Sequence, residues 1–462
     1  MIKWLSSDQS NNLNSYQYNL EMKGGELSQK PSIWIVGMVS NIFKMGDVMN
    51  KKKIFVGLVT AVFLFGLSSS VTAAVIKIGG LTDCTGATSD VGKDYALGLA
   101  DAFRYVNETN GINGKEIKYT WFDYGYRIPE ALTKYKLLKR MGVIAIEGWG
   151  TGDTEALSPT VFKDKLPYVS ASFSAHLTDP AKAPYNLFFA PDYSTQARAD
   201  LTTWFETRWP KHKDYGKRAP RFACVYEFAS PYASAPIKAI KDHATMLGFE
   251  IGPDQNVTLT AIDTKSQIMG LKKFNPDVCW HGNTTMSVSA TMRDAYSLDL
   301  GADWLVNFWG YDENLPRLAG EAAEGAMCAG PSYFFGSDEG IMKTVKEYAQ
   351  KYNPGVALDK RIKFTTAAWA NVLLLREAMI RADKAGDLTG PGILHKGFET
   401  MRDFEIADGG LGTGPVSYTP TDQRSTSIVP VFELKNGTFH YVKTINLQER
   451  WPDKWAKEWF GW

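Results

Sequence analysis

Two segments of this chain combine glycines and hydroxyl side chains in a way that could bind an anion. The first is residues 147–154, EGWGTGDT, and the second is residues 170–174, SASFS. Glycines let backbone N–H groups approach a ligand, and the N-terminus of a following helix adds a partial positive charge. Because both segments follow predicted strands, we expect their hydroxyl groups to lie together and to suit a carboxylate.

The glycine spacing of residues 147–154 does not support a nucleotide site. No lysine follows the glycines as in a Walker loop, and the spacing differs from the dinucleotide fingerprint. An enzyme acting on a nucleotide would also need a phosphate-binding lysine or a pair of metal-binding acids nearby, and the adjoining loops offer no convincing set. The alternative for this segment alone is a tight turn in which Thr151 or Asp153 caps the helix.

Strands and helices alternate along the chain from residue 75. The first series has strands at 75–80, 116–123, 143–147 and 168–170, and helices at 94–107, 129–141 and 153–163. A second series has strands at 222–226, 249–251, 277–280, 304–308 and 325–330, and helices at 235–247, 266–274 and 286–298. A helix at 363–382 and strands at 415–417 and 429–433 follow. This pattern predicts two Rossmann-like α/β lobes whose ligand lies beyond the carboxyl ends of parallel strands.

The composition agrees with a folded protein of two domains. The chain has 462 residues, 44% of them hydrophobic, and its 51 Lys and Arg balance 50 Asp and Glu to a net charge of +1. We therefore expect no nucleic-acid partner. The cysteines, Cys84, Cys224, Cys279 and Cys328, form no CxxC pair, which disfavours structural zinc. A disulfide between Cys224 and Cys279 stays open, since both fall on strands that we expect to be neighbours.

A secretory signal peptide is predicted at residues 49–73. Its parts are the cationic start MNKKK at 49–53, an apolar run at 54–67 and small residues at Val71 and Ala73 before a cleavage site that we expect after Ala73. The alternative is an uncleaved membrane anchor, but the apolar run is short for a bilayer span. Residues 1–48 are then a mis-called start or a disordered extension. The mature protein is expected in the periplasm.

Several short motifs resemble one known family. They are IGGLTDCTG at 78–86, NETNGINGK at 107–115, LPYVS at 166–170, FNPD at 274–277, AAEGA at 322–326 and TTAAW at 365–369. In this order and spacing the chain resembles the periplasmic substrate-binding proteins of branched-chain amino-acid ABC transporters. The resemblance implies a type I periplasmic binding fold, in which a three-strand hinge joins two lobes with parallel central sheets.

The resemblance also implies where the lobes divide and which residues hold the ligand. Lobe 1 would comprise 74–195 and 333–428, and lobe 2 would comprise 196–332 and 429–462, with crossings near 193–196, 331–333 and 428–430. The ligand carboxylate would be bound by the hydroxyl of Thr151 and by the hydroxyl and N–H of Ser174. The ammonium would be bound by the carbonyl of Ser172 and the carboxylate of Asp312.

The walls of the side-chain pocket are expected to be more aromatic and polar than those of a leucine binder. The positions that resemble them are Val91, Trp149, Phe173, Tyr232, Asn283 and Thr284. The identity of the ligand therefore stays open, and a larger aromatic or amide-bearing molecule is an alternative to an aliphatic amino acid.

The function that these observations predict is capture of a small amino-acid-like solute by closure of the lobes, followed by delivery to an ABC permease. We expect a monomer with no catalysis, no metal and no cofactor. The main alternative is a ligand-sensing module for an aromatic acid or amide that feeds a signalling partner.

Overall fold

The structure of this protein is a computed structural model that describes residues 75–461. The predicted signal peptide and residues 1–48 lie outside the described residues. Within 75–461, no helix combines the length and the apolar composition that a membrane crossing requires.

The first lobe is built on a five-stranded parallel sheet with the order β2-β1-β3-β4-β5. Its strands are β1 (Ile76–Thr82), β2 (Ile117–Asp123), β3 (Ala145–Gly148), β4 (Tyr168–Ser170) and β5 (Asn186–Leu187). Six of the seven residues of β1 are buried, as expected for a central strand with helices on both faces.

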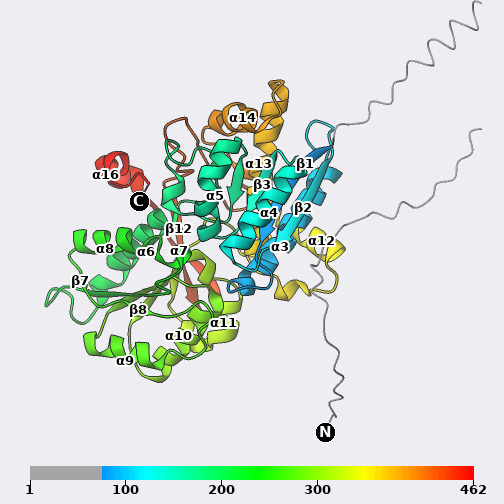
Figure 1. The fold of residues 1–462 in the computed structure, drawn as a ribbon. Coiled ribbons are helices and arrows are strands. Elements are labelled where there is room, and N and C mark those ends of the chain that lie inside the picture. The colour runs from blue at the N-terminus through cyan, green and yellow to red at the C-terminus, as the bar shows by residue number, and fades with distance from the viewer. Residues whose placement is uncertain (1–74, 462) are drawn as a thin grey trace, which may run out of the picture. The chain divides into compact units, whose positions relative to one another are not determined.

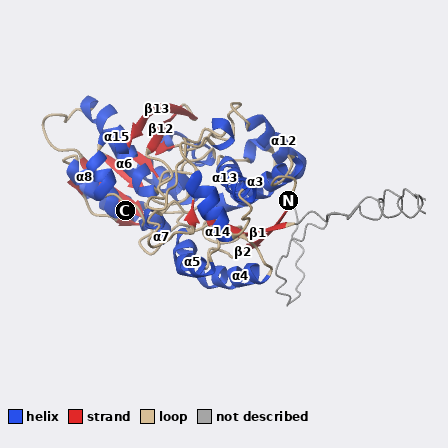
Figure 2. Cartoon of the chain, turned by 90° about the horizontal axis from the view of Figure 1, so that it is seen from above, coloured by secondary structure: helices blue, strands red, loops and turns tan. Residues whose placement is uncertain are grey.

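Four helices cover this sheet. They are α3 (Ser89–Glu108), α4 (Ile128–Arg140), α5 (Thr151–Asp164) and α13 (Phe364–Lys384). In Figure 2, α4 and α5 lie on one side of β1 and β2, and α3 and α13 lie on the other. Smaller elements complete the lobe, namely α12 (Met342–Tyr352) against α3 and α14 (Gly390–Gly392) beyond α13.

The second lobe is built on an eight-stranded mixed sheet with the order β13-β12-β11-β10-β9-β6-β7, in which β8 also pairs with β6. Its strands are β6 (Arg221–Tyr226), β7 (Glu250–Ile251), β8 (Gln255–Asn256), β9 (Val278–His281), β10 (Asp303–Val306), β11 (Met327–Ala329), β12 (Ile428–Lys435) and β13 (Thr438–Asn446). The pairs among β6 to β11 are parallel, as predicted, whereas β12 runs antiparallel to both β11 and β13.

The helices of the second lobe surround this sheet (Figure 1). They are α6 (Tyr193–Thr207), α7 (Pro231–Ser234), α8 (Ile237–Met246), α9 (Lys265–Phe274), α10 (Thr285–Ser297), α11 (Asn314–Ala319), α15 (Leu447–Arg450) and α16 (Pro452–Lys457). Because α6 packs on β11 and β12, segments far apart in the sequence share one core. The exact lobe boundaries and the three crossings stay a prediction.

The sequence-based elements differ from the structure in a few places. The helix predicted at 94–107 begins earlier, at Ser89, and residues 415–417 form no strand but only an isolated bridge between Phe404 and Val416. Helices α6 and α12 and the hairpin strand β13 were not predicted from the sequence. The turn of that hairpin carries an Asn-Gly pair, at residues 436 and 437, in the positive-φ backbone that favours these two residues.

The open question of a disulfide is resolved by strand register. Cys279 in β9 pairs with Ala223 in β6, one residue from Cys224. Successive side chains of a strand point to opposite faces, so Cys224 packs in the core on one face of the sheet and Cys279 in the core on the other. The two thiols therefore cannot pair, and all four cysteines are free.

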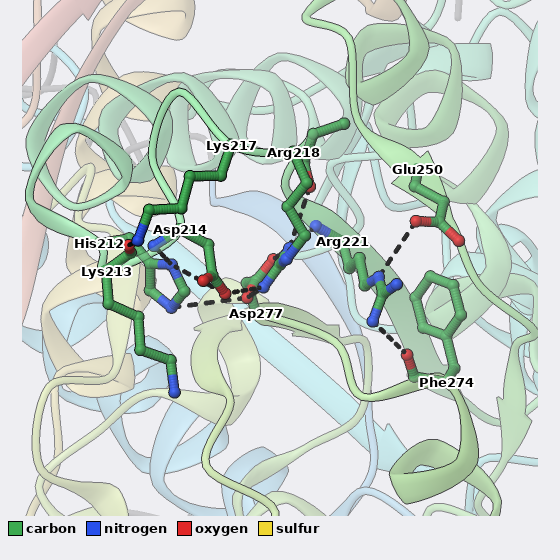
Figure 3. A network of polar contacts seen from close by, with 10 residues as sticks. His212, Lys213, Asp214, Lys217, Arg218, Arg221, Glu250, Phe274 and Asp277 are labelled. Carbon is green, nitrogen blue, oxygen red and sulfur yellow. Dashed lines mark hydrogen bonds and ion pairs between the residues drawn. The ribbon is translucent and has the colours of Figure 1, made fainter.

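A network of charged side chains fixes the amino-terminal edge of the second sheet, at the starts of β6 and β9 (Figure 3). The Arg218 guanidinium donates to both oxygens of Asp277, at 2.6 and 2.7 Å, and to Asp214 at 2.7 Å. The Arg221 N–H donates to the same Asp277 carboxylate at 2.7 Å. Burial alone would raise the pKa of Asp277, but the hydrogen bonds from Arg218 and Arg221 outweigh it, so the pKa is lowered.

We predict that Asp277→Asn lowers the free energy of unfolding by about 2 kcal/mol at pH 7, the amount typical of a lost charged hydrogen bond. Because the folded-state pKa of Asp277 is lowered, its contribution is present above the unfolded pKa and is lost as the pH falls through the folded pKa. The difference between wild type and variant in urea unfolding should therefore shrink as the pH is lowered from 7.

Asp453→Asn serves as the control, because the Asp453 side chain is 90% exposed and its ion pair with Lys457 lies on the surface. It should change stability by less than about 0.5 kcal/mol. An Asp277 effect that stays constant with pH would show that its charge is not what stabilises this edge.

Candidate functional site

A cavity lies at the carboxyl ends of the strands of both lobes. The first lobe lines it with Thr88, Tyr126, Trp149, Gly150, Thr151 and Ala171, and α6 and the second lobe line it with Tyr193, Tyr232, Thr284 and Trp309. Each of these residues follows the end of a strand or begins the next helix. This is the position where ligands of open α/β sheets bind.

One pole of the cavity is the N-terminus of α5. Gly150 is the N-cap residue and has no side chain to occupy the first N–H groups of the helix, which have no partner within it. The Thr151 hydroxyl accepts a hydrogen bond from Ser172 Oγ at 2.8 Å and interacts with the Tyr193 hydroxyl, so it would donate to a ligand by exchanging that second contact. Backbone N–H groups, a hydroxyl group and the positive end of the helix dipole thus lie together at this pole of the cavity.

A second pole lies at the N-terminus of α10. Thr284 is the N-cap residue of this helix, but its side chain makes no capping hydrogen bond. The hydroxyl oxygen is buried, and it interacts with the Asp90 carboxylate of α3. A hydroxyl can both donate and accept a hydrogen bond, so the Thr284 side chain can also contact a ligand in the cavity.

The walls between the poles are aromatic and fixed by hydrogen bonds. The Trp149 and Trp309 rings lie 4.9 Å apart at an angle of 70°. Trp149 Nε1 donates to Thr88 Oγ1 at 2.8 Å, and Trp309 Nε1 donates to the Tyr193 hydroxyl at 2.9 Å. Because the indole donors are occupied, these rings offer the ligand mainly apolar surface.

The charged groups nearest the cavity lie behind its lining. Glu147 at the end of β3 is completely buried, and burial raises its pKa well above the usual value, which favours the neutral form. Among the described residues, no Asp, Glu, Lys or Arg side chain lines the cavity. Hydroxyl groups, backbone donors and aromatic rings therefore dominate its chemistry.

The structure brings four of the sequence-predicted site residues to the cavity, namely Trp149, Thr151, Tyr232 and Thr284. The others lie outside the lining. Ser172 supports Thr151 through their hydrogen bond, and Phe173 packs behind the wall against Trp309 and Tyr193. Val91 belongs to the core of the first lobe, and the Asn283 amide joins three backbone groups and Ser287.

The contacts of Ser174 and Asp312 with a ligand stay predictions. In the structure, both side chains form hydrogen bonds with other groups of the protein. Ser174 Oγ donates to Glu155 at 2.7 Å. The Asp312 carboxylate accepts from the Asn314 N–H at 2.7 Å and from the Thr285 hydroxyl. Burial raises the pKa of Asp312 to about 7, which makes its carboxylate easier to protonate.

Sequence reasoning missed several residues of the lining, among them Thr88, Tyr126 and Tyr193. Tyr126 follows β2 and Tyr193 begins α6 after β5, so the expectation that ligands lie beyond strand ends could have included both. Tyr126 also has a φ of 56°, a left-handed backbone conformation that is unusual for a large residue. That conformation could not be read from the sequence.

Comparisons with known proteins agree with this architecture. A model of a family described as periplasmic binding protein matches residues 75–438. The crystal structure of an ABC transporter substrate-binding protein from Aeropyrum pernix has 33% sequence identity and a TM-score of 0.71, covering 80% of this chain and 96% of that one. Among curated proteins, none matches this chain.

Two further solved structures share the fold at lower identity. A branched-chain amino acid ABC transporter protein from Thermus thermophilus with bound valine has 21% identity and a TM-score of 0.74, covering 82% of this chain and 99% of that one. A solute-binding protein from R. palustris in complex with 4-hydroxybenzoate has 16% identity and a TM-score of 0.66, with the same coverage of 82% and 99%.

We predict that Gly150→Ala destabilises the protein, because the added Cβ would lie 2.4 Å from Asp153 Oδ1 and 2.6 Å from the Tyr124 hydroxyl. Both neighbours are buried and hydrogen-bonded to each other at 2.6 Å, so the free energy of unfolding should fall by about 1–3 kcal/mol. Thermal unfolding measures this change. At Gly336 an added Cβ would meet nothing within 4 Å, so Gly336→Ala is the control, and equal melting temperatures for both variants would contradict the close approach at Gly150.

Proposed function

This chain belongs to the periplasmic binding protein family, and we propose that it captures a small, amino-acid-like carboxylate in the cavity between its lobes. As a member of this family it is an extracytoplasmic solute-binding protein of an ABC transporter and not an enzyme. Such a protein delivers its ligand to a permease. We further propose that it acts as a monomer.

The observation that supports a carboxylate is the placement of the α5 N-terminus and the Thr151 hydroxyl at the cavity. A carboxylate accepts several hydrogen bonds and gains from the positive end of a helix dipole. Hydrogen bonds to a charged group also replace the water that the carboxylate loses on burial. In this proposal the ligand carboxylate lies against Thr151.

The aromatic walls support a ligand with an apolar or aromatic body. The Thermus thermophilus relative binds valine and the R. palustris relative binds 4-hydroxybenzoate, so this fold accepts both kinds of molecule. An amino acid would present its ammonium toward the second lobe, where Asp312 is the proposed acceptor once it exchanges its bond with Thr285. The Thr284 hydroxyl, which lines the cavity, offers a further contact at that pole.

An aromatic acid without an amino group is the second candidate, and the uncharged lining of the cavity favours it. A buried ammonium without an acceptor is costly, and Asp312 does not line the cavity. If the ligand carries no ammonium, the existing hydrogen bonds of Asp312 stay intact and the carboxylate serves only to hold the N-termini of α10 and α11.

Matched pairs of ligands test the proposal and distinguish an amino acid from an acid without an amino group. The pairs are L-phenylalanine with 3-phenylpropanoate, and L-leucine with 4-methylpentanoate, and each pair differs only in the amino group. Phenethylamine, which lacks the carboxylate, is the negative control. At least one acid should raise the melting temperature, because a ligand of the native state stabilises it, and phenethylamine should not.

We predict that Thr151→Ala weakens binding of the best of these acids by about tenfold or more in calorimetry, the loss expected for one hydrogen bond to a charged group. Thr151→Ser keeps the hydroxyl and should bind within a few-fold of wild type. Asp312→Asn should weaken the amino acids selectively if Asp312 binds the ammonium, and should affect both members of a pair equally if it does not. Unchanged affinity in Thr151→Ala would contradict the proposed carboxylate site.

A further inference from the structure

A single carboxylate of the first lobe caps a helix of the second lobe at the rim of the cavity. Asp90 lies in the first turn of α3, and its Oδ2 accepts a hydrogen bond from the N–H of Met286 in the first turn of α10 at 3.0 Å. The residue that should cap α10 from within, Thr284, makes no side-chain capping bond. The cap of this helix therefore comes from the opposite lobe.

The positions of the two bonded residues relate them directly to the cavity. Thr88 lines the cavity two residues before Asp90, and Thr284 lines it two residues before Met286. One hydrogen bond thus holds two lining threonines from different lobes at a fixed separation. The negative carboxylate also faces the positive end of the α10 dipole, which strengthens the contact beyond a neutral hydrogen bond.

We propose that Asp90 is a positioning residue that holds the two lobes closed over the ligand by capping α10 from the other lobe. This inference rests on the proposed function, since it concerns how the same cavity retains its ligand. When the lobes separate, the bond between Asp90 and Met286 must break and both groups must return to water. The bond therefore stabilises only the closed state, and its loss raises the fraction of open protein.

The surroundings of Asp90 agree with a role in closure and not in local packing alone. Its Oδ1 atom is buried, and burial raises the pKa of Asp90 to about 6. The carboxylate interacts across the cleft with both the Met286 N–H and the Thr284 hydroxyl, and within α3 it also accepts from the Val91 N–H. Two of its partners thus lie in the opposite lobe, so the side chain does more than stabilise the start of α3.

A second contact between the lobes provides an independent reporter of closure. Glu313 follows β10 in the second lobe, and its carboxylate accepts from the N–H of Lys363, the N-cap residue of α13 in the first lobe, at 2.8 Å. The Lys363 amide does not touch Asp90. Its hydrogen exchange should accelerate only if the lobes separate, whereas the Met286 amide would also respond to a purely local loss of its bond.

The experiment is hydrogen–deuterium exchange by mass spectrometry on the ligand-free, full-length protein, comparing wild type with Asp90→Ala. We expect exchange at the start of α10 and at the start of α13 to rise by about tenfold, the change that one charge-assisted hydrogen bond produces. Asp90→Asn keeps an acceptor oxygen without the charge and should show a smaller rise, which also covers the case in which Asp90→Ala does not fold.

Asp263→Ala is the matched control. Asp263 caps α9 through the Lys265 N–H at 3.1 Å, and both residues belong to the second lobe. This variant removes the same kind of contact without crossing the cleft, so it should change exchange at α9 and leave the Lys363 amide unaffected.

Binding of L-phenylalanine and 3-phenylpropanoate provides the second measurement. Asp90→Ala should weaken whichever probe binds by about tenfold, mainly through faster dissociation. Unchanged exchange of the Lys363 amide in both Asp90 variants would overturn this inference, whether or not a probe binds. If wild type binds neither probe but the exchange rises, the proposed ligand class fails and the role of Asp90 stands.

Discussion

Parallel strands all end at the same edge of their sheet, and this constraint accounts for the position of every residue in the cavity. In each lobe the loops that leave this edge lead into helices, so backbone N–H groups and capping hydroxyls gather there. Two such edges meet around the cavity, and Thr151 and Thr284 begin or cap a helix on either side of it. The topology of the sheets therefore determines which kinds of group surround the cavity, and the individual side chains only adjust this arrangement.

The aromatic walls depend on the same edge, but their rigidity comes from hydrogen bonds behind them. Each indole that faces the cavity donates to a hydroxyl, and that hydroxyl donates onward, from Thr88 to Asp83 and from Tyr193 to the Ala171 carbonyl. Such fully paired networks hold the rings in one orientation without placing a charge against the ligand. The walls thus contribute shape and apolar area, and the helix ends contribute charge complementarity.

Local patterns were enough to predict most of the fold. Strands such as β1 and β4 are short apolar runs between turns, and α4 and α9 show the one-sided apolar pattern of surface helices. By contrast, α6 is buried along residues 193–204 although its sequence is rich in Ser, Thr and Gln, so it has no apolar stripe to detect. Its burial is a product of packing on β11 and β12, which are distant in sequence.

The candidate site was predictable to the extent that it follows from strand ends. Thr151 and Trp149 come directly after β3, so their place at the cavity follows from the order of elements. Ser174 and Asp312 could not be resolved in this way, because which neighbour occupies a buried hydroxyl or carboxylate depends on three-dimensional contacts. The contact between Asp90 and Met286 joins residues 196 positions apart, and no local pattern indicates it.

The orientation of the cysteines determines how readily their thiols can be oxidised. Cys224 and Cys279 point to opposite faces of one sheet, and burial raises the pKa of both thiols, so the reactive thiolate form is scarce. Cys328 is equally buried. In the folded protein, these three thiols should therefore react slowly with oxidants, whereas Cys84 is only partly buried and is the cysteine that an oxidant could reach.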